Sequence, residues 1–120
     1  MSAGRARARF RIGALSVIGG LALSGAAAIA RPGDTTPQRH VVEISGMAFH
    51  PAVLEVQRGD TVVWINRDIV PHTATAMDGS GWDTGNLIQG QSGRYVPRES
   101  GEEPYRCVLH PIMEGTLIVR

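Results

Sequence analysis

The stretch LEVQRGDTVVWINRD, residues 54–68, decides the fold because it combines two strand patterns and a turn signal. Leu54 and Val56 alternate with polar residues, as in a strand with one buried face. RGD at residues 58–60 is a turn signal. TVVWI at residues 61–65 is apolar on both faces, which is typical of a strand in the middle of a sheet. The stretch therefore predicts two consecutive strands, of which the second is central.

Further strand patterns lie on both sides of this stretch. Residues 40–45 place Val42 and Ile44 on one face and Glu43 on the other. The remaining predicted strands are residues 95–97, 105–107 and 116–119, and glycine-rich loops are predicted at residues 78–81 and 89–93. About seven short strands without a helical period are typical of a β-sandwich. The fold class predicted from the sequence is therefore all-β.

The N-terminal segment has the features of an export signal. Residues 1–11 hold four arginines and no acid, and the apolar run at residues 12–30 ends in the small-x-small pattern Ala-Ile-Ala. We predict a signal peptide at residues 1–30, a polar tether at residues 31–39 and one domain at residues 40–120. The apolar run is 19 residues long, so an uncleaved leader would anchor the protein in a membrane. The arginines are not adjacent, and the export route stays open.

Charge and cysteine content narrow the function. Eight of the twelve arginines and all eleven acids follow Ala30, so the part after the leader carries a net charge of −3. It has no basic stripe interleaved with aromatic residues, which argues against a nucleic-acid partner. A single cysteine cannot form an internal disulfide, the common means of stabilising small exported domains. Stability must therefore come from the core, from a metal, or from both.

The only cysteine stands in CVLHPIM, residues 107–113, three residues before a histidine and six before a methionine. Cys107 is expected to face inward, because the charged Arg106 before it faces water. The chain then loops over one end of the sandwich and can aim Cys107, His110 and Met113 at one point. A thiolate and an imidazole bind a soft or borderline metal strongly, and a thioether binds it weakly.

Two histidines, one cysteine and a distant methionine form the ligand set of a blue-copper electron-transfer site. That set requires a second histidine, and the sequence offers His40, His50 and His72. His72 is best placed, because it follows the central strand after a proline and can reach the same end of the sandwich. His50 is interpreted as a surface turn residue, and His40 lies at the junction with the tether.

Other interpretations stay open on the residues alone. Cys107 could be a buried core thiol without a metal, as is common for free cysteines. It could also be the nucleophile of a thiol hydrolase with His110 as the base. Such sites need a third group that orients the base and an oxyanion hole, which one short loop does not supply. An exported copper carrier would use the same ligands, and a metal-free binding sandwich would use none.

Several segments together resemble the cupredoxins, most closely the amicyanin-like group, with plastocyanins and pseudoazurins nearby. They are GMAFHP at 46–51, the opening stretch at 54–68, PHTAT at 71–75, WDTGNL at 82–87 and YRCVLHPIMEGTLIV at 105–119. The spacing Cys-x-x-His-x-x-Met is the short ligand loop of amicyanins. The resemblance covers about residues 40–120 and implies a Greek-key β-sandwich with one type 1 copper ion. It also implies that His72, Cys107 and His110 are strong equatorial ligands and Met113 the weak axial ligand.

One departure from the family pattern concerns the residues that follow two of these ligands. Many members have asparagine after the first histidine and serine or threonine after the cysteine, joined by a hydrogen bond between the ligand loops. Here these positions hold Thr73 and Val108. Valine has no polar side-chain atom, so this link must be absent or run through the backbone. Such outer contacts tune a metal site, which leaves the reduction potential open.

The function that follows is a copper-binding one-electron carrier that cycles between Cu(I) and Cu(II), and not an enzyme. The partners implied are exported redox proteins, such as a c-type cytochrome or a dehydrogenase or reductase, with the carrier a monomer in the periplasm. The ring of His110 is expected at the surface, where an uncharged patch allows weak and brief docking. The predicted electron-transfer surface comprises Pro71, Leu109, His110, Pro111 and Ile112.

Overall fold

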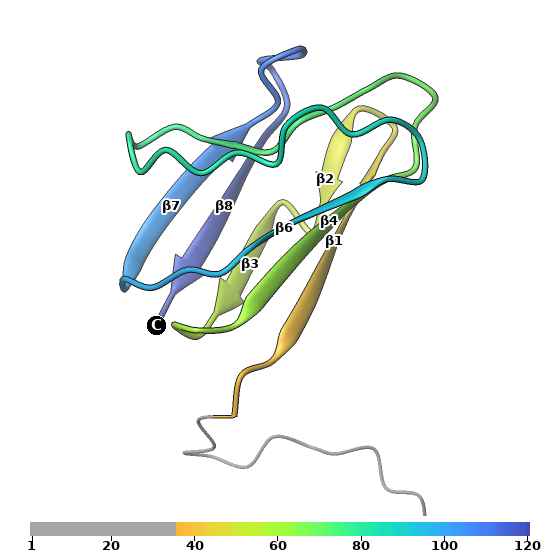
Figure 1. Ribbon diagram of the computed structural model, residues 1–120. Helices are drawn as coiled ribbons and strands as arrows, with labels where there is room; N and C mark the ends of the chain where they lie inside the picture. Colours follow the sequence, from red (N-terminus) through yellow and green to blue (C-terminus); the bar gives the residue numbers. More distant parts are fainter. Residues whose placement is uncertain (1–35) are drawn as a thin grey trace, which may run out of the picture. The chain divides into compact units, whose positions relative to one another are not determined.

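The computed structural model describes residues 36–120, which form the predicted β-sandwich (Figure 1). The strands are β1 (Arg39–Ser45), β2 (Ala48–His50), β3 (Val53–Val56), β4 (Thr61–Asn66), β5 (Thr75–Ala76), β6 (Ser92–Tyr95), β7 (Gly101–Arg106) and β8 (Glu114–Val119). The predicted signal peptide or anchor and residues 31–35 of the predicted tether lie outside the described residues. Within the described part of the chain, no helix is long and apolar enough to cross a membrane.

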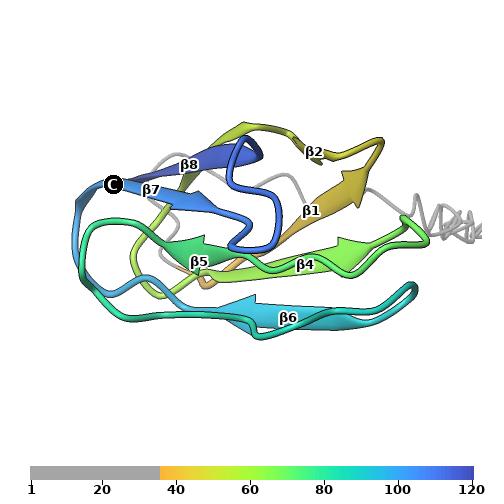
Figure 2. The ribbon, with the colours of Figure 1, turned by 90° about the horizontal axis from the view of Figure 1, so that it is seen from above.

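The eight strands form two sheets of four. One has the order β2-β1-β4-β6 and the other β3-β8-β7-β5. Figure 2 looks along the sandwich and shows the two sheets as separate layers. The chain crosses repeatedly between them, and two of the resulting neighbours, β1 with β4 and β3 with β8, are parallel. As predicted, β4 lies between two other strands.

The core lies between the sheets and consists of the inward-facing residues of each strand. Val42 and Ile44 have no exposed surface, which confirms the predicted inner face of β1. In β4, Trp64 has no exposed surface and its neighbour Val63 is 6% exposed, as expected for a central strand that is apolar on both faces. Val56 of β3 is buried, and Leu54 packs against the same core from a partly exposed position. Burying such side chains contributes about 1.5–3 kcal/mol each relative to leaving them exposed.

Two predicted strands have other limits, and two short strands were not predicted. The strand predicted at residues 105–107 is β7, which begins at Gly101 and ends at Arg106. The strand predicted at residues 95–97 overlaps β6 only at Tyr95, because β6 spans Ser92–Tyr95, so Gly93 lies in a strand and not in a loop. A Cβ atom on Gly93 would lie 2.7 Å from the Cβ atom of Thr84. The glycine therefore marks a close approach of two segments, which sequence patterns do not separate from a turn. Strands β2 and β5, three and two residues long, were not predicted.

The turn between β3 and β4 is built around a buried carboxylate. Gly59 has a φ of 89°, which favours glycine. Asp60 accepts hydrogen bonds from the backbone N–H groups of Gln38 and Gln57, each at 2.9 Å, and lies 2.9 Å from Nε2 of His40. Burial alone would raise the pKa of Asp60, but these partners outweigh burial and lower it. The carboxylate thus ties the start of β1 to the turn.

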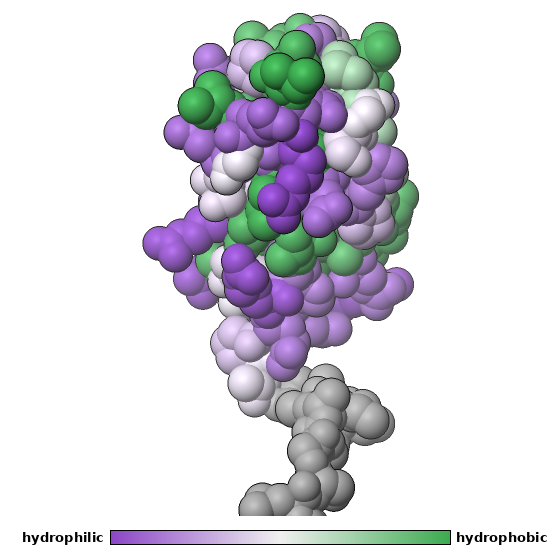
Figure 3. Space-filling view, turned by 90° about the vertical axis from the view of Figure 1, so that its right-hand side faces the viewer, coloured by the Kyte–Doolittle hydropathy of each residue, from purple (hydrophilic) through white to green (hydrophobic). Residues whose placement is uncertain are grey.

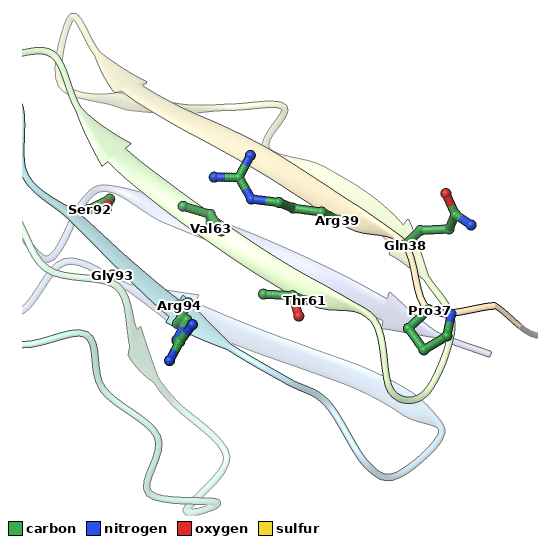
Figure 4. A pocket seen from close by; sticks show the side chains of 8 residues that line it. All are labelled: Pro37, Gln38, Arg39, Thr61, Val63, Ser92, Gly93 and Arg94. Carbon is green, nitrogen blue, oxygen red and sulfur yellow. The ribbon is translucent and has the colours of Figure 1, made fainter. Parts of the chain in front are cut away.

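The outer face of the first sheet carries a surface cavity of about 570 Å³. Figure 4 shows its lining, in which the side chains of Arg39 and Arg94 lie over β1 and β6. The other lining residues are Pro37, Gln38, Thr61, Val63, Ser92 and Gly93. None of the predicted metal ligands lines this cavity.

Candidate metal centre

Three side chains meet at one end of the sandwich. Cys107 directly follows β7, and His110 lies on the loop that connects β7 to β8. His72 lies in the segment between β4 and β5, where its backbone forms two hydrogen bonds with Leu87, of 3.1 and 2.8 Å. Figure 2 shows the β7–β8 loop over this end, where the segment after β4 also passes. The sandwich therefore brings together two segments more than 30 residues apart in the sequence.

The donor atoms of this cluster lie close enough to share one metal ion. The Sγ atom of Cys107 is 3.8 Å from Nδ1 of His72 and 3.7 Å from Nδ1 of His110. One ligand atom from each residue lies within 4.8 Å of the other two. His72 and Cys107 are fully buried, whereas His110 is partly exposed. Two imidazole nitrogens and one sulfur are the donors that copper takes in trigonal sites with a weak axial thioether.

Met113 closes the same loop from below. Its side chain is buried at 3% exposure and belongs to the hydrophobic core that includes Cys107. Its carbonyl accepts a hydrogen bond from the N–H of Cys107 at 3.1 Å, and its own N–H donates to the carbonyl of His110 at 2.9 Å. The two bonds fold the loop on itself, so that the backbone of Met113 lies beside those of Cys107 and His110.

Asp68 orients His72 from behind. Its Oδ2 atom lies 2.9 Å from Nε2 of His72, and its carboxylate also accepts the N–H groups of Gly46 at 2.8 Å and Met47 at 3.0 Å. The N–H of Met47, and then those of His72 and Gly46, lower the pKa of Asp68, against the opposing effect of burial. An ionised carboxylate only accepts, so Nε2 carries the proton and Nδ1 keeps its lone pair for a metal. This role of Asp68 was not predicted from the sequence.

A pair of hydrogen bonds joins the two ligand segments. The N–H of Thr73 donates to Sγ of Cys107 at 3.3 Å, and the hydroxyl of Thr73 accepts the N–H of Val108 at 3.0 Å. The link expected in the family is therefore present, but on one side it uses the backbone of Val108. The prediction left two possibilities, an absent link or a backbone route, and the structure has the second.

The two other histidines considered lie away from the cluster. His50 is the exposed last residue of β2, and its Nε2 atom lies 3.1 Å from the carbonyl of Ser45. His40 pairs with Asp60 at the β3–β4 turn. Among the described residues, His72 is thus the histidine that joins Cys107 and His110.

The residues predicted to form the electron-transfer surface differ in exposure. Pro71 and Pro111 are exposed, Leu109 is 44% exposed, and Ile112 is 90% exposed, while His110 is partly exposed between them. Ile69, at 86% exposure, lies three residues after Asn66, the last residue of β4, and was not predicted as part of this surface. Figure 3 shows apolar residues at the upper end of the domain, the end from which the β7–β8 loop rises.

A two-sheet sandwich with two histidines and one cysteine clustered at one end, and a buried methionine on the same loop, defines the class of cupredoxins. The chain belongs to the amicyanin family within that class. It is 31% identical over 90 residues to amicyanin of Paracoccus versutus, covering 72% of this chain and 68% of the relative. The sequence matches no protein-family model.

Other relatives agree with this assignment. Amicyanin of Paracoccus denitrificans is 32% identical over 83 residues, and the match spans 63% of that protein's length. A solved amicyanin variant with a methionine-to-alanine substitution, in the Cu(I) state, matches with a TM-score of 0.65 and 30% identity over 68% of this chain and 82% of that one. A proline-to-alanine variant in the oxidized state gives a TM-score of 0.65 at 31% identity with the same coverage.

Proposed function

We propose that this protein is a one-electron carrier that holds one type 1 copper ion through His72, Cys107 and His110, with Met113 as a weak fourth ligand. The observation that carries the proposal is the convergence of three donor atoms within 4.8 Å. Two imidazoles and a thiolate bind copper strongly, and a thioether on the same loop tunes it. Bound copper would supply one-electron exchange between Cu(I) and Cu(II).

The surrounding residues support this role because they hold the ligands in place independently of the metal. Asp68 fixes the ring of His72, and Thr73 fixes both the sulfur of Cys107 and the backbone of Val108. Ligands held in one arrangement need little movement when the charge of the bound ion changes. Little movement favours fast electron exchange, and outer contacts of this kind also tune the potential of a metal site.

We further propose that electrons enter and leave through the exposed edge of His110. The uncharged residues around it let a redox partner approach without removing water from charged groups. Small interfaces with brief contact are typical of electron-transfer encounters. The partners that fit are exported redox proteins such as a c-type cytochrome or a dehydrogenase or reductase, reached after export by the leader at residues 1–30.

The electron-transfer surface is tested by changing Ile112 to Glu, which places a charge on the most exposed apolar residue of the patch. Electron self-exchange between two copies should slow, while the copper absorption spectrum stays unchanged. Val53→Glu is the matched control, because Val53 is a 59% exposed apolar residue on β3 outside the loop. Equal self-exchange rates in Ile112→Glu and the wild type would mean that the electron-transfer surface lies elsewhere on the protein.

The alternative function, a copper carrier that hands its metal to another protein, uses the same ligands and is separated by one observation. An electron carrier keeps its copper through repeated reduction and oxidation in the presence of a Cu(I) chelator. A copper carrier loses it on reduction. The enclosure of His72 and Cys107, both without exposed surface, favours retention.

A further inference from the structure

Every tryptophan and tyrosine of the sequence lies in one line of stacked rings. The chain has two of each. The ring centroids of Tyr95 and Trp82 are 4.4 Å apart, those of Trp82 and Trp64 are 5.3 Å apart, and those of Trp64 and Tyr105 are 5.3 Å apart. The first two pairs are stacked, with interplanar angles of 12° and 28°, and the third meets edge to face. Trp82 also contacts Tyr105 directly, with ring centroids 5.7 Å apart and an interplanar angle of 52°. Contact from Tyr95 to Tyr105 is thus unbroken, and every path between them passes through Trp82.

The line runs from a partly exposed edge of the domain to the metal centre. Tyr95 and Trp82 are partly exposed, whereas Trp64 and Tyr105 are fully buried. Tyr105 and Cys107 are both buried and two residues apart, so their Cα atoms lie about 7 Å apart along the chain. The outer end, Tyr95, is the last residue of β6, whereas His110 lies on the loop between β7 and β8.

The polar atoms of the inner rings are buried. They are the indole nitrogens of both tryptophans and the hydroxyl of Tyr105. Hydrogen bonding from the indole of Trp82 lowers the pKa of Glu103, and that from the indole of Trp64 lowers the pKa of Tyr105, in each case against the larger opposing effect of burial. Phenylalanine has no such donor, so these residues supply polar contacts as well as packing.

The outer ring has a proton acceptor. The hydroxyl of Tyr95 donates a hydrogen bond of 3.1 Å to Oε1 of Glu103, which is 9% exposed. Burial raises the pKa of Glu103, and burial together with the charge of Glu103 raises the pKa of Tyr95 to about 12. A phenol that loses an electron becomes a strong acid and passes its proton to such a carboxylate.

We infer that Tyr95, Trp82, Trp64 and Tyr105 form a second electron route, which carries oxidising equivalents from a radical at the β6 edge to the reduced metal centre. The inference rests on the copper assignment proposed above. Its substrate class is a strong one-electron oxidant, such as an oxygen-centred or azide radical. Tryptophan and tyrosine are among the side chains that lose one electron most readily, and sulfur ligands are the others.

The electrons and protons balance in this route. The radical takes one electron from Tyr95, whose phenolic proton moves to Glu103. Electrons would then pass outward from Trp82, from Trp64 and from the reduced metal centre, with Tyr105 bridging the last step without being oxidised, and the proton would return to Tyr95. With copper held by His72, Cys107 and His110, the net change would be reduction of the radical to its anion and oxidation of Cu(I) to Cu(II). This spares Cys107 and Met113 the stepwise oxidation that damages sulfur side chains.

The test uses the copper-loaded domain in the Cu(I) state and azide radicals generated by pulse radiolysis. In the wild type, the absorbance of the aromatic radicals should fall and the blue band should appear with one first-order rate constant, independent of protein concentration. Trp82→Phe, which fills similar space but is not readily oxidised, should lose this phase. Phe49→Leu is the control. The ring centroid of Phe49 lies 4.8 Å from that of Tyr105, but Phe49 is not one of the residues of the proposed route.

The metal-free domain provides a second readout that does not depend on copper. There the radical formed on an indole should pass to Tyr95 as a persistent phenoxyl radical, and Tyr95→Phe should lose that signal. Absence of the phenoxyl signal in the metal-free wild type would overturn the inference. An unchanged first-order appearance of the blue band in copper-loaded Trp82→Phe would also overturn it. If the wild type gave the phenoxyl signal but no blue band on adding copper, the proposed function would fail and the intramolecular route would stand without its copper terminus.

Discussion

Replacing Asp68 by alanine tests whether the orientation of His72 is set before the metal arrives. The substitution removes three contacts of one carboxylate, with Nε2 of His72 and with the N–H groups of Gly46 and Met47. The two N–H groups belong to an exposed turn and can bond to water instead. The ring of His72 has no exposed surface, so its Nε2–H would be left without a partner.

The magnitude follows from this difference in exposure. Each turn bond should cost about 0.5 kcal/mol, the low end for a bond exchanged with water, and the unpaired buried N–H about 1–3 kcal/mol. The metal-free domain should therefore lose about 2–4 kcal/mol of its free energy of unfolding. Without the carboxylate, the proton of His72 is no longer held on Nε2. Copper affinity should then fall about 10–100-fold, the usual effect of losing such a contact.

Urea unfolding of the metal-free domain measures the first quantity, and competition with a copper chelator measures the second. Asp78→Ala is the control, since it removes the same charge from an exposed loop residue that is not one of the candidate metal ligands. Asp68→Asn keeps the size and one acceptor oxygen and should fall between the wild type and Asp68→Ala. An Asp68→Ala protein with wild-type copper affinity would refute the reasoning, whatever its stability.

Three further predictions concern the axial ligand, a close contact and a pH effect. Met113→Gln should keep copper and shift its reduction potential, which cyclic voltammetry measures, because a weak axial ligand tunes the site without holding it. Gly115→Ala should lower the free energy of unfolding by about 1–3 kcal/mol, because its Cβ would collide with the ring of Tyr105. The lowered pKa of Asp60 means that its stabilising effect is present above the pKa of an unfolded aspartate and is lost as pH falls through the lower folded value. Between neutral and acidic pH, the thermal unfolding temperature should therefore fall less in Asp60→Asn than in the wild type. Identical pH dependence of the unfolding temperature in the two proteins would contradict this.

The sandwich and the cluster of candidate metal ligands could be predicted because each depends on a strong local pattern. Two-residue alternation gave the inner faces of β1 and β3, where Val42, Ile44 and Val56 are buried. The spacing within residues 107–113 indicated a ligand loop, and the position of His72 after the central strand indicated its partner. A strand end and a short loop leave few other places for these side chains.

The features that were missed depend on contacts between distant segments. The limits of β6 depend on the approach of Thr84 to Gly93, and a glycine in sequence looks the same in a turn and in a strand. Asp68 lies four residues before His72, but that spacing becomes informative only once the β1–β2 turn is known to lie beside it. The line of aromatic rings likewise joins β4, β6, β7 and a loop, and no pattern within one segment predicts it.

The most direct test of the central claim is the visible absorption spectrum of the domain after addition of one equivalent of Cu(II). A thiolate and two imidazoles around copper predict an intense blue or green colour from sulfur-to-copper charge transfer, saturating at one ion per chain. Cys107→Ser should remain colourless under the same conditions. A colourless wild type, or a Cys107→Ser protein as blue as the wild type, would contradict the assignment of the copper site.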